Sequence, residues 1–148
     1  MKKIELLAPA GDLEKLKTAI DYGADAVYFG GGEFSLRAAA GNFSPYELAE
    51  GVSYAHDRGR KVYMTVNIFA HNEDIAKFPE YMKSIEGVDV DAFLVSDPGL
   101  LTLLRQLRPD AEIHLSTQAN TTNYMTKGRA KAGCQPCRAC PACLSDHA

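Results

Sequence analysis

The chain has 148 residues, of which 46% are hydrophobic and 24% are charged, a composition close to that of ordinary soluble domains. This length suits one domain with a hydrophobic core and is short for two. The net charge of −3 excludes a basic field over the whole molecule, although a local basic patch stays open. The sequence has no run of about 18 apolar residues and no apolar signal segment at its start. We therefore expect a cytoplasmic protein without a membrane span.

Five short apolar segments within the first 126 residues have the length and composition of buried strands. Turn residues bound them, and amphipathic segments separate them. Strands are therefore predicted, in chain order, at residues 4–8, 26–29, 61–69, 92–95 and 112–117.

The segments between these strands carry helix signals. Asp12 is placed to cap the first helix, and Gly23 suits a left-handed stop at its end. The second helix begins with a capping box over residues 44–47, Ser-Pro-Tyr-Glu. Asn72 is placed to cap the third helix, in which Pro79 predicts a kink or a late start. A fourth helix follows the fourth strand.

The alternation of strand and helix predicts an α/β fold with a parallel sheet and helices outside it. An open doubly wound sheet and a closed eight-stranded barrel share this pattern, and short strands without a phosphate-binding fingerprint favour the barrel. About five strands cannot close such a barrel. The prediction is a partial parallel β/α (TIM-type) barrel in residues 1–126, followed by an irregular Cys-rich C-terminal tail in residues 127–148.

Small and polar side chains gather where the predicted strands end, which in a β/α barrel is the functional rim. Their chemistry suits hydrogen bonding to a planar or anionic small molecule. The structural alternative is that Asp12 and Asn72 cap helices, that residues 30–32 form a turn, and that Asn67 is a satisfied strand end. The candidate pocket residues are Pro9, Gly11, Asp12, Tyr28, Gly30, Arg37, Asn67, Asp97, Ser116, Thr117, Gln118 and Asn120.

The common catalytic motifs are missing from the sequence. It has no H-E-x-x-H zinc motif, no G-x-S-x-G nucleophile elbow and no phosphate-binding P-loop. His114 and Ser116 share one face of the last predicted strand, but the sequence shows no orienting partner for either. The catalytic residues are therefore unassigned.

Six segments carry a specific resemblance to one known family. They are LLAPAGD at 6–12, AVYFG at 26–30, FSLR at 34–37, VN at 66–67, VSDPG at 95–99 and HLSTQAN at 114–120. Across residues 4–124 the chain resembles the N-terminal region of peptidase family U32, the collagenase-like proteases. The resemblance implies a barrel-type catalytic domain.

The resemblance implies two kinds of chemistry. The family is named for proteolysis, with a peptide as substrate. Several members are associated instead with oxygen-independent hydroxylation of transfer RNA, ribosomal RNA or ubiquinone precursors. Those relatives carry an iron–sulfur cluster, and some depend on prephenate. The family's later segment, with a Glu and closely spaced cysteines, has no counterpart here, so the resemblance supplies no cluster ligand.

Three functional hypotheses follow from the resemblance. We expect a truncated U32 member whose parent function is nominally proteolysis and which has little activity alone. The first alternative is a component of RNA or ubiquinone-precursor hydroxylation. The second is a non-enzymatic fragment that forms a homodimer through its open barrel edge.

The final segment, residues 127–148, differs sharply in composition from the rest. It holds all four cysteines, Cys134, Cys137, Cys140 and Cys143, at three consecutive C-x-x-C steps. Thiolates at such spacing bind zinc or iron–sulfur clusters, but the third step is one residue shorter than in bacterial ferredoxins. The favoured interpretation is a sequence that is not the family's own, such as a frameshifted or truncated reading. A native metal site and an unstructured redox-sensitive tail are the alternatives.

Overall fold

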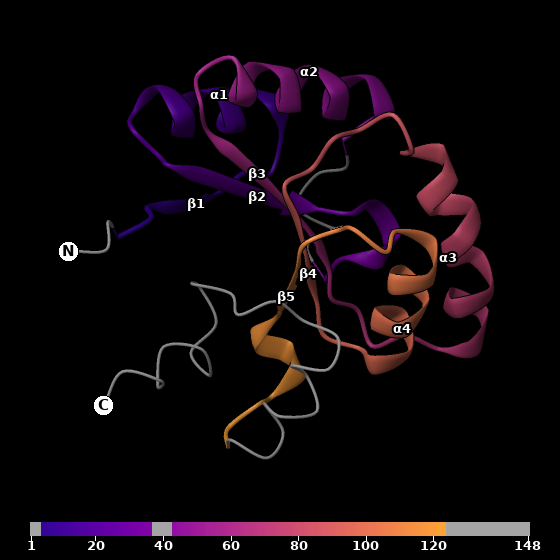
Figure 1. Ribbon diagram of the computed structural model, residues 1–148. Helices are drawn as coiled ribbons and strands as arrows, with labels where there is room; N and C mark the ends of the chain where they lie inside the picture. Colours follow the sequence, from indigo (N-terminus) through magenta and orange to yellow (C-terminus); the bar gives the residue numbers. More distant parts are fainter. Residues whose placement is uncertain (1–3, 37–42, 124–148) are drawn as a thin grey trace.

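The computed structural model describes residues 4–36 and 43–123 (Figure 1). Short strands alternate with helices along this part of the chain, as the sequence predicted. In chain order the elements are β1 (Leu7–Pro9), α1 (Leu13–Asp21), β2 (Ala26–Gly30), the 3-10 turn η1 (Gly32–Phe34), α2 (Pro45–His56), β3 (Lys61–Val66), α3 (Asn72–Ser84), β4 (Ala92–Val95), α4 (Pro98–Leu107), β5 (Ile113–Leu115) and the 3-10 turn η3 (Thr117–Ala119).

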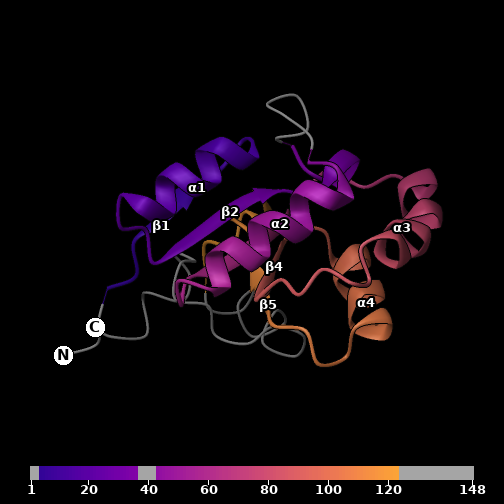
Figure 2. The same cartoon turned by 90° about the horizontal axis from the view of Figure 1, so that it is seen from above.

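The strands form one parallel sheet in the order β1-β2-β3-β4-β5. In a doubly wound sheet the strand order reverses at a switch point, whereas in a β/α barrel each strand pairs with the next one in the chain. The observed order is that of the barrel. The two views show the four helices gathered on one side of this sheet (Figures 1 and 2). The α/β class and the partial barrel are therefore confirmed.

The side of the sheet that faces the helices is a continuous apolar core. Along each strand alternate residues point to this side, as the two-residue period of a strand requires. Val27 and Phe29 of β2, Val62 and Met64 of β3, and Phe93 of β4 belong to the same buried cluster. The helices add Leu16, Ile20, Leu48, Val52, Phe78, Met82, Leu100 and Leu104. Apolar contacts across this face pack the helices against the sheet.

The helix starts agree with the predicted capping signals except at α3. The Asp12 carboxylate accepts the backbone N–H of Lys15, and Ser44 with Glu47 forms the capping box of α2. Helix α3 is capped by His71 rather than Asn72, because the Asp74 carboxylate takes the His71 backbone N–H. The α3 helix contains Pro79 and still begins at residue 72, so of the two predicted effects of Pro79, a kink or a late start, the late start does not occur.

Four strands differ in extent from their predicted ranges, β2 only by the addition of Gly30. Pairing of β1 begins at residue 7, and the preceding Leu6 carbonyl accepts the N–H groups of Asp25 and of Ala26, the first residue of β2. Strand β3 ends at Val66 rather than residue 69, because the N–H groups of Asn67 and Ile68 donate to the Phe34 carbonyl. Strand β5 covers three residues of the predicted six. The loop after β2 thus ends β3 early.

The opposite, inner face of the sheet carries the alternate residues of each strand, those that do not point towards the helices. The strand register places Pro9, Tyr28, Tyr63 and Ala92 in one row and Gly30, Thr65, Leu94 and His114 in the next. Asn67, Ser96 and Ser116 follow where β3, β4 and β5 end. The inner face is therefore mainly apolar in the first row and polar towards the carboxyl ends of the strands.

Several predictions lie beyond what this part of the chain tests. Arg37 and the tail with its four cysteines fall outside the described residues. Strands β1 and β5 are the two edges of the sheet, and the homodimer expected through an open edge stays a prediction, as does the division at residue 126. None of the helices in residues 4–36 and 43–123 has the length and hydropathy of a membrane span.

Candidate functional site

The buried polar residues of the described chain are concentrated in one place. Five residues combine a polar side chain with burial: Ser35, Thr65, Asn67, His114 and Ser116. Four of them lie on the inner face near the carboxyl ends of β3 and β5, and Ser35 reaches them from the loop after β2. Burying a polar side chain costs free energy unless the side chain is hydrogen-bonded. A cluster of five buried polar residues is therefore a candidate functional site.

A hydrogen-bond network joins three of the loops that follow the strands. The Ser35 and Thr65 hydroxyls lie 2.7 Å apart, and Thr65 Oγ1 donates to the Phe29 carbonyl at 3.0 Å. The Leu36 backbone N–H donates to Asn67 Oδ1 at 3.2 Å. Because β2, β3 and β5 each contribute a member directly or through their following loop, the network fixes these loops relative to one another.

Gln118, in the turn η3, is the hub of this network. Its amide oxygen accepts from Asn67 Nδ2 at 3.1 Å, from Thr117 Oγ1 at 3.3 Å and from Ser116 Oγ. The Leu36 N–H is an unambiguous donor, so it identifies Asn67 Oδ1 as the acceptor and Nδ2 as the donor to Gln118. The Gln118 NH₂ group is left as a donor for other partners.

His114 lies one step deeper on the inner face, in the row of Thr65. Its Nε2 atom is 2.7 Å from Glu112 Oε1, while its Nδ1 atom is buried and has no hydrogen-bond partner within the described part of the chain. The Tyr63 ring packs edge-on against the imidazole, with centroids 5.1 Å apart, and its hydroxyl donates to the Glu5 carboxylate. Burial, followed by the nearby Glu5 carboxylate, raises the pKa of Tyr63, so this hydroxyl stays protonated.

The structure brings part of the predicted pocket together. Asn67, Ser116, Thr117 and Gln118 join one network. Tyr28 and Gly30 lie on the same inner face by their register. Pro9 also lies on this face by its register with Tyr28, exposed at the end of β1. Two other candidates are elsewhere: Gly11 precedes the α1 cap, and Asn120 is exposed in a left-handed conformation.

Two predicted pocket carboxylates have structural partners. Asp12 caps α1 and pairs with the Lys15 ammonium, and this contact lowers the pKa of the Asp12 carboxyl. Asp97 caps α4 by accepting the Leu100 N–H at 2.9 Å. Asp12 thus makes the contacts of a helix cap, the alternative to a pocket residue that the sequence left open, and Asp97 is also a helix cap.

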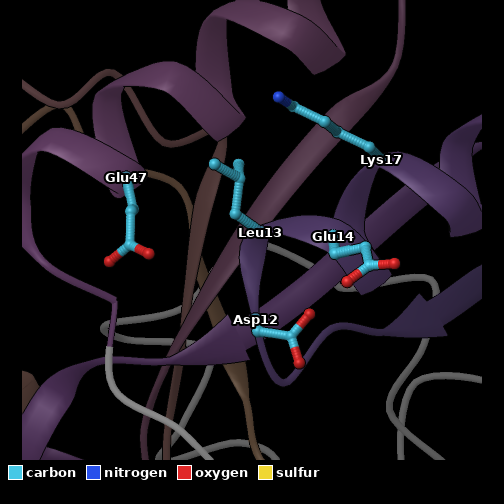
Figure 3. Close-up of a pocket in the computed structure, with 5 residues that line it drawn as sticks. All are labelled: Asp12, Leu13, Glu14, Lys17 and Glu47. Carbon is cyan, nitrogen blue, oxygen red and sulfur yellow. The ribbon is translucent and has the colours of Figure 1, made fainter.

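A hollow of about 450 Å³ lies beside the Asp12 cap, between the first turns of α1 and α2 (Figure 3). Its charged lining is mostly engaged: Lys17 Nζ is 2.6 Å from Glu50, and Glu47 accepts from Ser44. The hydrogen bonds from the Ser44 backbone and hydroxyl lower the pKa of Glu47. These charges stabilise the helix starts, and the inner face is the stronger candidate site.

Three members of the site were missed by sequence reasoning. Thr65 was detectable, because it lies two residues before Asn67 and shares its strand face. Glu112 was detectable in the same way as the partner of His114, but it stood at the predicted strand edge. Ser35 was not detectable, since the sequence does not indicate how the loop after β2 folds back to bring Ser35 to Asn67.

The family resemblance implies an iron–sulfur cluster, which requires ligands that the described residues do not supply. Such clusters need thiolate ligands, and the first cysteine of the chain is Cys134, outside the described residues. Within residues 4–36 and 43–123, His, Cys, Asp and Glu form no group of three that could hold a metal. This part of the chain does not by itself fit a cluster.

Comparison with known proteins gives a family match and close relatives. The model of peptidase family U32 matches residues 11–133. The tRNA hydroxylation protein P1 of Bacillus subtilis is 50% identical over 123 residues, which cover 83% of this chain and 29% of that protein. An uncharacterized protease of Methanocaldococcus jannaschii is 47% identical over 126 residues, covering 85% of this chain and 30% of the protease. The chain thus spans about 30% of the length of these relatives.

A solved structure supports the fold alone. Phosphonopyruvate hydrolase superposes with a TM-score of 0.56 at 15% sequence identity, over 88% of this chain and 52% of that enzyme. The match covers about half of the larger protein, which agrees with a partial barrel.

Proposed function

The chain belongs to peptidase family U32, and from this membership we propose that it acts in tRNA hydroxylation rather than in proteolysis. The observation that carries the proposal is the 50% identity to the tRNA hydroxylation protein P1 of Bacillus subtilis, over most of this chain. The protein is expected to work in the cytoplasm, where tRNA is found.

The chemistry of the inner face supports this proposal. The network formed by Ser35, Thr65, Asn67, Ser116 and Gln118 is neutral and consists of hydroxyl and amide groups. Such groups recognise planar heterocycles by hydrogen bonds to their edges, and base recognition in RNA uses the same amide and hydroxyl donors and acceptors. The Gln118 NH₂ group is placed to contribute a donor.

The same geometry argues against a serine nucleophile. A serine is activated by a neighbouring base that takes its proton, as in hydrolases with a Ser-His pair. Ser116 shares a face with His114, yet its hydroxyl donates to the amide oxygen of Gln118, which is not a base. The arrangement holds Ser116 as a structural donor.

The short length of the chain shapes the proposal. The B. subtilis tRNA hydroxylation protein P1 and the M. jannaschii protease are each more than three times as long as the part matched here, because that part is 29% and 30% of them. We propose that the chain supplies one wall of the site and that the remaining wall comes from sequence equivalent to the rest of those relatives. Alone, the chain is expected to have little activity.

A chimera tests the proposal. Residues 1–126 would replace the matching segment of the B. subtilis protein in a strain that lacks its tRNA hydroxylation proteins, and nucleosides from total tRNA would be analysed by mass spectrometry. We expect hydroxylated nucleosides, each heavier by one oxygen atom, to return with the chimera and not with the 148-residue chain alone. A soluble chimera that leaves tRNA unmodified would contradict the proposal.

Proteolysis is the second candidate, because the M. jannaschii relative named a protease is 47% identical. Purified chain and chimera would be incubated with gelatin, and the products separated by gel electrophoresis. Cleavage that disappears in both the Ser116→Ala and the Asp97→Asn variants would favour this candidate. We expect no cleavage, since the Ser116 hydroxyl donates to the Gln118 amide oxygen and the Asp97 carboxylate caps α4 through the Leu100 N–H.

A further inference from the structure

His114 is a buried titratable residue that the proposed function does not yet use. Its side chain is 6% exposed, and its Nδ1 atom has no hydrogen-bond partner among residues 4–36 and 43–123. A buried polar atom without a partner is destabilising, so its presence in a folded protein calls for an explanation. The position of His114, next to the carboxyl end of β5, is where β/α barrels place reacting groups.

Glu112 fixes which imidazole nitrogen carries the proton. A carboxylate accepts hydrogen bonds, so the 2.7 Å contact between Glu112 Oε1 and His114 Nε2 places a hydrogen on Nε2. In the neutral imidazole Nδ1 is then a lone-pair acceptor. Glu112 is two residues earlier in the chain, directly before β5 begins, and its side chain is 46% exposed. It therefore holds the imidazole ring from the amino end of the strand.

The neighbours of the imidazole do not supply a donor for Nδ1. Tyr63 packs edge-on against the ring, but its hydroxyl hydrogen goes to Glu5, at 3.0 and 3.1 Å from the two carboxylate oxygens. Leu94 is the residue opposite His114 in the register of β4. Ser116, two residues further along the face, donates to Gln118.

We propose that Nδ1 of His114 is the proton acceptor for a ligand that binds on the inner face of the sheet and presents an O–H or N–H group, with Glu112 as the positioning residue. The ligand's X–H bond breaks with its electron pair left on X, and an N–H bond forms at Nδ1. The resulting imidazolium is stabilised by the Glu112 carboxylate, and the reverse step returns the proton. The proposal rests on the proposed function in one respect, that unhydroxylated tRNA is the ligand used to test it.

The chain contains a matched control pair. His56 Nε2 is 2.9 Å from Asp91 Oδ2, so this histidine also faces a carboxylate. Asp91 in addition accepts the Val62 backbone N–H, and the pair lies between the end of α2 and the start of β4, away from the inner face. A structural pair of this kind should not respond to a ligand on the inner face.

Nitrogen-15 spectra of the histidine rings in the full chain test the proposal. The His114→Gln variant identifies the His114 signals by their loss. At alkaline pH, where imidazoles are neutral, we expect the Nε2–H form for His114, the same form in Glu112→Gln, and a mixture of both forms in Glu112→Ala. A His114 ring with its hydrogen on Nδ1 would overturn the proposal.

Addition of unhydroxylated tRNA separates this proposal from the proposed function. We expect the His114 Nδ1 resonance to move towards the position of a hydrogen-bonded nitrogen while the His56 signals stay unchanged. Bound tRNA that leaves His114 Nδ1 unmoved would overturn the proposal. A chain that does not bind tRNA but holds His114 in the Nε2–H form would contradict the proposed function and support the oriented acceptor.

Discussion

The two faces of the sheet differ in what they bury. The face towards the helices holds large apolar side chains such as Phe29, Met64 and Phe93, whereas the inner face carries the buried polar residues Thr65, Asn67, His114 and Ser116. Both sets come from the same strands by the two-residue alternation. The helix-facing side therefore stabilises the fold, and the inner face is the candidate functional site.

The largest expected effect separates the two faces within one strand. Phe93→Ala removes a fully packed ring from the helix-facing core and should cost about 3–5 kcal/mol of unfolding free energy. The neighbouring Leu94→Ala, on the half-buried inner face, should cost clearly less. Urea unfolding of both variants measures the difference. Equal losses would show that the inner face is as tightly packed as the helix-facing one.

The network on the inner face should show a smaller but specific effect. Asn67→Ala removes the acceptor for the Leu36 N–H and the donor to Gln118, which should cost about 1–3 kcal/mol. Asn72→Ala is the control, because Asn72 is exposed and does not cap α3. Its expected change is within about 0.5 kcal/mol. Thermal unfolding compares the two, and a larger loss for Asn72→Ala would contradict the assignment.

Tyr81 offers a test of burial on the helix side at high pH. Burial first, and the Glu33 carboxylate second, raise the pKa of Tyr81 to about 12. A raised pKa in the folded state stabilises the protein below the ordinary tyrosine value near 10, and that stability is lost as the pH rises towards about 12. Tyr81→Phe should therefore flatten the alkaline decline in stability. An unchanged alkaline profile would contradict this burial.

The smallest effect concerns an exposed cap outside both faces. Hydrogen bonds from Ser44 lower the pKa of Glu47, so Glu47 stabilises the folded state above its ordinary value of 4.5 and loses that effect as the pH falls. Glu47→Gln should reduce the acid dependence of unfolding, measured between neutral and acid pH. Ser44→Ala keeps the backbone donor and should retain part of it. Identical profiles for all three proteins would refute the cap.

The sequence predicted the elements of this fold better than the contacts of its site. Alternation of short apolar segments and caps such as Asp12 and Ser44 identified every strand and helix that the structure describes, because these signals are local. Strand ends were less predictable: β3 stops at Val66 because a distant carbonyl, that of Phe34, takes the following N–H groups. Long-range contacts of this kind leave no local pattern.

Long-range contacts also explain why the candidate site was predicted only in part. Strand ends identified Asn67, Ser116 and Gln118, but the pairing of Ser35 with Thr65 depends on how the loop after β2 folds back. The assignment of Asp12 and Asp97 to the pocket was made from position alone, and the structure shows both as helix caps. Glu112 was detectable two residues before His114, but its contact with the His114 Nε2 atom is seen only in the structure.

The most direct test of the account is the Gln118→Leu change in the chimera with the B. subtilis protein. Gln118 is exposed and joins Asn67, Thr117 and Ser116 through one oxygen, so its loss should leave the fold intact and disorganise the inner face. Misplaced site groups cost about a hundredfold in rate. We predict a loss of tRNA hydroxylation of that order, measured by mass spectrometry of tRNA nucleosides, in a chimera that still unfolds cooperatively on heating. Full hydroxylation by the Gln118→Leu chimera would contradict the claim that this polar face is the functional one.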